Sequence, residues 1–186
     1  MPAHALAFGA SLLVGPALTL PATVTATATN SRGQVTTDTV TFHPVAGPLG
    51  EVQLELGDRF ISSFVGDLST VPINADSNGV HATGRETLIL AGYRFTFDLF
   101  GRSGKPPISP YVGLGTLGGL GSVAVSATNG GQTAVASGSK FTLEFDAVLG
   151  AHWRLNEHFG LRAEVGASTY GGVGAIEPRL GAYATF

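Results

Sequence analysis

The strongest constraint in this sequence is a repeated alternation of apolar and polar side chains with a period of two. Residues 87–99, 141–153 and 175–186 all show it, and within the first of them Arg94 and Asp98 lie opposite an unbroken apolar face. Neighbouring side chains of a β-strand point to opposite faces, so the pattern predicts strands with one oily and one charged side. Such a charged face lies either in water or in the lumen of a membrane barrel.

Composition favours lipid contact. Charged residues make up 12% of the 186-residue chain, against roughly 25% in ordinary soluble domains, and there are 27 glycines. Beyond the amino-terminal segment no run of about 20 apolar residues suggests a membrane helix. The net charge of -3 provides no basic surface for nucleic acid, and the absence of cysteine excludes disulfides and thiolate metal sites.

The first 43 residues leave alternatives open. Residues 1–21 are expected to be either a secretory leader or an extra amino-terminal strand, and residues 22–186 the barrel domain. Thr- and Val-rich runs at 23–29 and 35–43, joined by Asn30 to Gly33, predict a β-hairpin. The 22–43 hairpin also looks like a hairpin of bacterial immunoglobulin-like surface domains, and it lies either in the barrel wall or outside it.

From Glu51 onward the strands are regular. One strand is expected to continue past a bulge at Gly57 to Phe64, and others follow at 87–99, 110–127, 141–153, 161–167 and 175–186. Polar loops at 66–84 and 129–139 alternate with short turns at 44–50, 101–109 and 154–158. Counted from Thr23 there are eight strands, which predicts an eight-stranded antiparallel up-and-down transmembrane β-barrel with a periplasmic carboxyl terminus. The expected aromatic belt at that end is Phe100, Tyr111, Trp153, Phe159 and Phe186.

Three segments resemble the OmpA-like family of small outer-membrane β-barrels of Gram-negative bacteria. They are PYVGLG at 110–115, FGLRAEVG at 159–166 and the terminal LGAYATF at 180–186. The resemblance implies contact with outer-membrane lipid and lipopolysaccharide, and recognition of the carboxyl-terminal strand by the barrel-assembly machinery. Ala182 and Ala184 stand where the family often has larger side chains.

The inward faces of the strands carry charges of both signs. An eight-stranded barrel has an interior that side chains fill, so these groups are expected to pair as a structural plug rather than line an ion channel. The expected polar network of the lumen is Glu51, Glu55, Arg59, Arg94, Asp98, Lys140, Glu144, Asp146, His152, Arg162, Glu164, Glu177 and Arg179. Among these, His152 is interpreted as a paired lumen histidine rather than a proton relay.

The sequence predicts no cofactor, metal site or catalytic set. The five histidines lack metal-ligand spacing, and only His81, with Thr83 and Glu86, approximates the arrangement of a barrel hydrolase acting on lipid A. The leading hypothesis is a non-enzymatic, monomeric barrel that anchors surface loops for envelope integrity, adhesion or recognition. The alternatives are that hydrolase, a soluble β-barrel or sandwich, and a narrow channel or carrier of a small apolar ligand, whose lumen the glycines between Gly113 and Gly121 would leave open.

Overall fold

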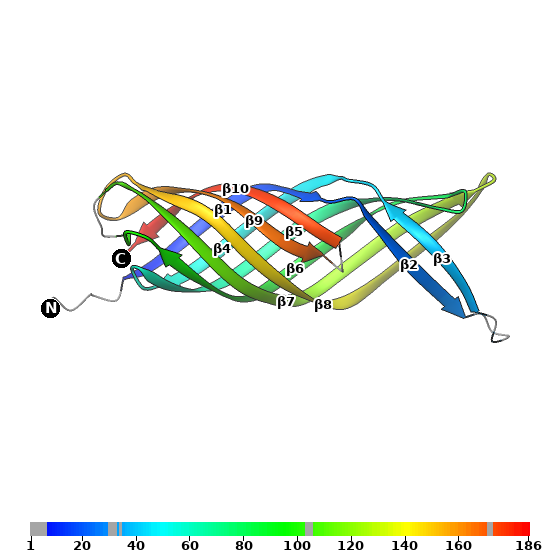
Figure 1. Cartoon of the computed structure of the whole chain (residues 1–186), viewed down its shortest axis with the longest axis horizontal. Coiled ribbons are helices and arrows are strands. Elements are labelled where there is room, and N and C mark those ends of the chain that lie inside the picture. The colour runs from blue at the N-terminus through cyan, green and yellow to red at the C-terminus, as the bar shows by residue number, and fades with distance from the viewer. Residues whose placement is uncertain (1–6, 30–32, 34, 103–105, 171–172) are drawn as a thin grey trace.

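The protein forms one closed β-barrel with a projecting hairpin (Figure 1). The computed structural model describes residues 7–29, 33, 35–102, 106–170 and 173–186. No helix in this described part is long and apolar enough to cross a membrane. The strands are β1 (Phe8–Thr19), β2 (Ala22–Thr29), β3 (Val35–Phe42), β4 (Ala46–Leu56), β5 (Phe60–Ser77), β6 (Val80–Asp98), β7 (Ile108–Asn129), β8 (Gln132–Arg154), β9 (Phe159–Tyr170) and β10 (Val173–Thr185).

Eight of these strands make the wall, in the order β1-β4-β5-β6-β7-β8-β9-β10, and β1 closes it by pairing antiparallel with β10. All the pairings are antiparallel. The eight-stranded antiparallel barrel predicted from the sequence is therefore confirmed. Closure matters because it leaves no continuous sheet edge along the barrel, as a structure immersed in lipid requires.

The membership of the wall differs from the count that began at Thr23. β1, from the amino-terminal segment, is a wall strand between β4 and β10, whereas β2 and β3 pair with each other outside the wall. The hairpin meets the barrel at its base, where Thr41 and Phe42 pair with Asp76 and Ala75 of β5. The predicted turn at 30–33 lies, except for Gly33, outside the described residues, as do residues 1–6.

The two long polar segments are strands rather than loops, which corrects the sequence interpretation. Residues 66–84 continue β5 and β6 to a two-residue turn at Asn78 and Gly79, where φ is 44° and 78°. Residues 129–139 likewise belong to β7 and β8, which pair from Ile108–Trp153 to Asn129–Gln132. The Asp, Asn, Ser and Gly content of these segments, together with Pro72, indicated loops, although the apolar Val71, Ile73 and Ala75 still occupy every second position along β5.

The opposite end of the barrel has short turns, and it is also where β1 begins and β10 ends. Gly57 is not a bulge within a strand: its φ of 118° begins a tight turn that separates β4 from β5. The predicted turn at 44–50 is also wrong, because β4 already begins at Ala46, close to the base of the hairpin. In Figure 1 this terminal end lies on the left and the hairpins extend to the right.

Exposed aromatic side chains ring the terminal end. Phe100, Trp153, Phe159 and Phe186 are all exposed there, and Phe8 packs against Phe186 with ring centroids 6.2 Å apart. Aromatic rings of this kind favour the level of the lipid headgroups. Tyr111 does not join them, because it points into the lumen and is 3% exposed. Its orientation follows the regular alternation of β7, in which Tyr111 and Gly113 point inward and Val112 and Leu114 outward.

The seam between β1 and β10 predicts a sharp sensitivity to one methyl group. A Cβ on Gly181 would lie 1.9 Å from the carbonyl oxygen of Leu12, whereas a Cβ on Gly50 of β4 would meet nothing within 4 Å. We expect Gly181→Ala to destabilise the folded barrel by about 1–3 kcal/mol through overpacking. Urea unfolding in detergent micelles, read by tryptophan fluorescence, measures the change. Gly50→Ala is the matched control, and equal unfolding midpoints for the two variants would contradict the prediction.

Candidate functional site

The inward faces of the wall strands bring most of the predicted lumen residues together. Eleven of the thirteen are buried, and they come from β4, β6, β8, β9 and β10. These eleven are Glu51, Glu55, Arg94, Asp98, Glu144, Asp146, His152, Arg162, Glu164, Glu177 and Arg179. Eight of them form one connected set of ion pairs and hydrogen bonds, whereas Asp98 and His152 pair with each other outside that set. Glu144 Oε2 has no hydrogen-bond partner in the described structure.

Arg94 lies at the centre of this network. Its Nη1 and Nη2 donate to the two carboxylate oxygens of Glu51 at 2.8 Å each, and its Nε donates to Oδ2 of Asp146 at 2.7 Å. Arg179 approaches the same Glu51 at 2.8 Å and also contacts Glu164 at 2.8 Å and Glu177. Bidentate and shared contacts of this kind offset the desolvation of charges that are fully buried.

Arg162 links the centre of the network to the terminal end. It donates to Oε1 of Glu55 at 2.6 Å, to Gln53 at 3.0 Å and to the hydroxyl of Tyr111 at 2.6 Å. Tyr111 in turn donates to Glu164 at 2.6 Å. The aromatic residue assigned to the belt is therefore part of the lumen network, where its hydroxyl has two charged partners.

A second cluster closes the lumen at the terminal end. Nδ1 of His152 lies 2.7 Å from Oδ2 of Asp98, and the His152 ring stacks on Tyr111 with centroids 4.4 Å apart. Asp98 also accepts from the backbone N–H of Gly101 at 2.9 Å and from Ser109. His152 thus has a fixed carboxylate partner, as the interpretation of a paired lumen histidine requires.

Two predicted members lie outside the network. Arg59 is exposed in the turn between β4 and β5, with its guanidinium 5.4 Å from the centre of the Phe97 ring. Lys140 is half exposed near the hairpin end, where its Nζ lies 3.4 Å from Glu86. Both were assigned to the lumen only from the alternation of side chains along their predicted strands. The alternation does not apply to Arg59, because the chain turns there. Lys140 is on the inward face of β8 with Thr142 and Glu144, but it lies at the mouth cavity, beyond the filled part of the lumen.

The structure also adds members that the sequence interpretation missed: Gln53, Asp67 and Arg102 are buried in the lumen, as is Tyr183. Gln53 shares the face of Glu51 and Glu55, so the same alternation identifies it. Asp67 lies in a segment that was interpreted as a loop, and Arg102 in one interpreted as a turn. The alternation of side chains along a strand predicts no inward or outward direction for such segments. Arg102 reaches back to pair with Glu55.

Buried acids outnumber buried arginines. Among the described residues the lumen holds eight carboxyl groups, four guanidinium groups and His152. Asp67 Oδ1 and Glu144 Oε2 have no hydrogen-bond partner within the described structure. None of the described residues forms a group of three or more His, Asp or Glu arranged to hold a metal ion.

An apolar layer lies above the charged network, on the side of the hairpins. It consists of inward side chains packed as one cluster: Ala17, Leu49, Val65, Val71, Leu88, Leu90, Leu117 and Ala175. Leu88 and Val65 are completely buried. The lumen is therefore closed twice, first by paired charges and then by hydrocarbon, and neither layer provides a water-filled path for ions.

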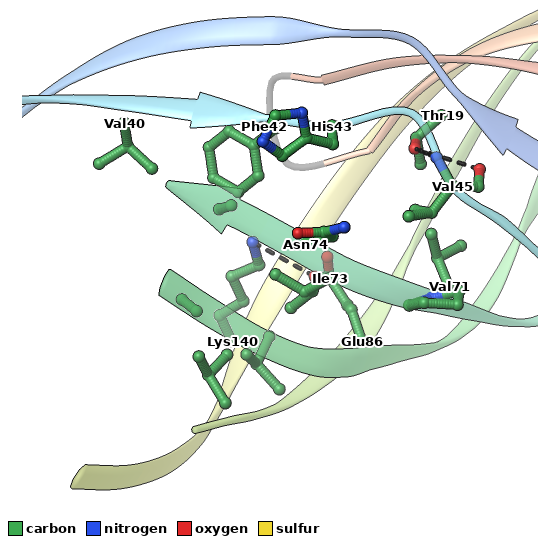
Figure 2. A pocket seen from close by; sticks show the side chains of 15 residues that line it. Thr19, Val40, Phe42, His43, Val45, Val71, Ile73, Asn74, Glu86 and Lys140 are labelled. Atoms are coloured by element: carbon green, nitrogen blue, oxygen red, sulfur yellow. Dashed lines mark hydrogen bonds and ion pairs between the residues drawn. The ribbon is translucent and has the colours of Figure 1, made fainter. Parts of the chain in front are cut away.

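The glycines of β7 do not leave the lumen open. A Cβ on Gly113 would lie 2.8 Å from Val148 and 2.9 Å from Thr96, and one on Gly115 would lie 3.2 Å from the Cβ of Arg94. Larger side chains of the neighbouring strands occupy this space. A cavity of about 360 Å³ lies at the hairpin end, between the base of β3 and the barrel mouth (Figure 2).

Ion pairs and hydrogen bonds hold the projecting hairpin at its base. His43 Nε2 lies 2.6 Å from Oδ2 of Asp76, His81 Nδ1 lies 2.7 Å from Oδ1 of the same carboxylate, and Asn78 donates to Asp38. Hydrogen bonds with His81, and then with His43, lower the pKa of Asp76 below its ordinary value. The ionised carboxylate thus joins β3, β5 and β6 at the point where the hairpin leaves the wall.

The residues considered for a hydrolase do not form a catalytic set. The described partner of the His81 ring is Asp76, and that of the Glu86 carboxylate is Lys140. Nucleophilic catalysis needs a base within hydrogen-bond reach of the nucleophile, and no hydrogen bond links His81 to Thr83 in the described structure. His81 instead serves the attachment of the hairpin.

Comparisons with known proteins identify the fold. No family model matches the chain, and no curated protein matches it in sequence. Among solved structures, the outer membrane protein OprG from Pseudomonas aeruginosa is similar with a TM-score of 0.58 and 11% identity, covering 96% of this chain and 95% of its own. Neisserial surface protein A (NspA) is similar with a TM-score of 0.50 and 13% identity, covering 97% of each chain. The chain has the fold of the small transmembrane β-barrels of the Gram-negative outer membrane, as the sequence predicted.

The central network predicts a large cost for removing Arg94. Arg94→Met would leave Glu51 and Asp146 buried with fewer compensating charges, which typically costs 3–5 kcal/mol, so we expect a loss of about that size. Arg59→Met is the matched control, because the exposed Arg59 should change stability by less than about 0.5 kcal/mol. Reversible urea unfolding in micelles measures both. Similar losses for the two variants would show that the network does not stabilise the barrel.

The attachment of the hairpin is expected to depend on pH. Because the folded-state pKa of Asp76 is lowered, its contribution is complete above the ordinary aspartate pKa and is lost as the pH falls through the lowered value. Spin labels on Thr37→Cys and Thr83→Cys, in a chain without native cysteines, would report a broader distance distribution at acid pH. In an Asp76→Asn background the acid transition should disappear, and in an Asp38→Asn background it should remain.

Proposed function

We propose that this protein is a non-enzymatic outer-membrane barrel that presents rigid hairpins at the cell surface to bind an extended polypeptide of a partner. The long hairpins would face the exterior, and the short turns, both chain ends and the aromatic ring the periplasm, which is the usual asymmetry of such barrels. Outer-membrane lipid and lipopolysaccharide would surround the wall. The barrel-assembly machinery would recognise β10, the strand that completes it.

The observation that carries the proposal is the free edge of β8. β8 has 23 residues, about twice the 9–11 that cross a membrane, and it pairs with β7 along its whole length. Its other edge pairs with β9 only from Asp146 to Arg154. No described strand pairs with that edge over residues 132–145, so its backbone groups are available to a further strand.

The side chains along this edge do little to prevent strand addition. Exposed edges are normally protected by charges, prolines or bulges. Residues 132–139 contain neither charge nor proline, and every one of them is exposed. An extended peptide that adds to a sheet edge gains backbone hydrogen bonds whatever its sequence and gains specificity from alternate side chains. Lys140 follows directly and would favour a partner with an acidic residue at that end.

The experiment shortens the β7–β8 hairpin in register. Residues 124–137 are replaced by Asn-Gly, so that Val123 and Gly138, which pair in the structure, flank a two-residue turn. Peptides selected from a random library on the intact barrel in nanodiscs are then tested on this variant. We expect bound peptides to protect the backbone amides of residues 132–140 from hydrogen exchange and to lose binding to the shortened barrel.

The matched control shortens the projecting hairpin instead. Residues 25–39 are replaced by Asn-Gly between Val24 and Val40, leaving the attachment at Thr41 and Phe42 intact. Peptide binding should survive in this variant. Binding that persists without the β7–β8 extension, or a library that yields no ligand for the intact barrel, would refute the proposal.

The double closure of the lumen predicts electrical silence. The protein reconstituted in planar bilayers should show no steady conductance, because paired charges and the apolar layer around Leu88 fill its cross-section. Large stable currents would contradict this reading of the interior.

The proposed location in the outer membrane has its own test. The protein should fractionate with the outer membrane, and its gel mobility should change on heating.

A further inference from the structure

A cavity of about 360 Å³ opens at the hairpin end of the barrel (Figure 2). Its walls are mainly hydrocarbon, and most of this surface comes from three strands that are distant in sequence: Val40 and Phe42 of β3, Val71 and Ile73 of β5, Val123 and Val125 of β7. Residues of β1, β6 and β8 complete the lining. The size is within the range of pockets that bind small molecules, and an apolar lining with few polar groups is typical of them. The projecting hairpin supplies one wall, so the site exists only while the hairpin is attached.

Five polar side chains line this cavity, and two of them already have partners: Thr19 bonds to the backbone of Val45, and His43 to Asp76. The other three are Asn74, Glu86 and Lys140. Oδ1 of Asn74 and Oε1 of Glu86 are buried and have no hydrogen-bond partner in the described structure. Lys140 lies 3.4 Å from that Glu86 oxygen, which balances its charge without making a hydrogen bond of good geometry. In Figure 2 a dashed line marks the ion pair between Lys140 and Glu86, and Asn74 and Ile73 are drawn beside it.

The unpaired oxygens define the chemistry that the cavity lacks. A buried acceptor without a donor is costly, and a ligand that donates a hydrogen bond removes that cost. A hydrocarbon would leave both oxygens unpaired. A carboxylate or phosphate would bring negative charge beside Glu86, and a free ammonium group would meet the charge of Lys140. A neutral donor on an apolar body satisfies all of these conditions.

We propose that this mouth cavity is a binding site for a small, neutral, apolar molecule with one hydroxyl group. The hydroxyl donates to Asn74 Oδ1 or Glu86 Oε1, and the body packs among the valines, Ile73 and Phe42. The site shares only Lys140 with the free edge of β8, and binding of a small molecule there does not depend on the proposed recognition of a polypeptide. The apolar layer beneath the cavity makes it a closed-ended pocket rather than the entrance to a channel.

The five isoleucines of the chain allow a test that separates binding from membrane partitioning. Ile73 lines the cavity, Ile61 is buried in the lumen, and Ile89, Ile108 and Ile176 are exposed on the lipid side. The barrel is labelled with ¹³C at isoleucine δ1 methyl groups, placed in nanodiscs and titrated with 1-naphthol. Parallel titrations use 1-methylnaphthalene, which lacks the donor, and 1-naphthoate, which is an anion.

We expect 1-naphthol to shift the Ile73 signal saturably, while the three lipid-facing signals move in proportion to concentration. At equal free concentration, 1-methylnaphthalene should bind Ile73 roughly tenfold more weakly, the ratio that corresponds to one neutral hydrogen bond. Asn74→Leu should reduce that ratio and Glu86→Gln should preserve most of it if Asn74 is the main acceptor; the reverse result would assign Glu86. An unchanged Ile61 signal shows that each variant is folded.

Three results would overturn the proposal. The first is an Ile73 response that never departs from that of the lipid-facing isoleucines, which indicates partitioning alone. The second is equal affinity for 1-naphthol and 1-methylnaphthalene, which removes the role of the acceptors. The third is tighter binding of 1-naphthoate, which would make Lys140 the recognition group and the natural ligand an anion. Val125→Phe, which narrows the cavity, provides the blocked control and should abolish the saturable shift.

Discussion

The buried pairing of arginine with carboxylate is the interaction on which this structure depends. Arg94 and Arg179 share Glu51, and Arg162 ties Glu55 to Glu164, so that five strands of the wall meet through four guanidinium groups and their partners. The interior of an eight-stranded barrel is just wide enough for its own inward side chains to fill, and charges without partners there would oppose folding. The pairs both fill the interior and fix the register of the strands that carry them.

Above these charges the interior changes character along the barrel axis. The charged network gives way to the layer around Leu88 and Leu117, and that layer to a cavity with apolar walls. The outer surface also changes along the axis: exposed aromatic rings lie at the terminal end, and polar hairpins lie at the other. A single strand therefore passes through several environments. The surroundings of each side chain depend on its position along the barrel axis as well as on the face of the strand from which it projects.

This dependence on position along the barrel bears on what the sequence could and could not predict. The alternation in residues 87–99 and 141–153 was sufficient to predict the fold and most of the lumen network, because in these segments one face lies on the outside of the barrel and the other in the lumen. The β5–β6 and β7–β8 extensions were assigned as loops because they are rich in Asp, Asn, Ser and Gly and the first contains Pro72, and Asp67 was missed with them. Arg102 was missed because it lies in a turn, where side chains do not alternate between two faces. Tyr111 was missed because the many glycines of 110–127 left the inward face of that strand undetermined.

The pairing of the first wall strand with the last has a consequence for the order of assembly. Gly9 pairs with Thr185, so the final contact joins residues from opposite ends of the chain, and it has the largest loop-closure entropy of any pairing in the wall. Until β10 is made, β1 has an unprotected edge, and every partial sheet has two. The wall consequently becomes compatible with the bilayer only when β10 has paired with β1, and any truncation within Val173–Thr185 shortens the strand that closes it.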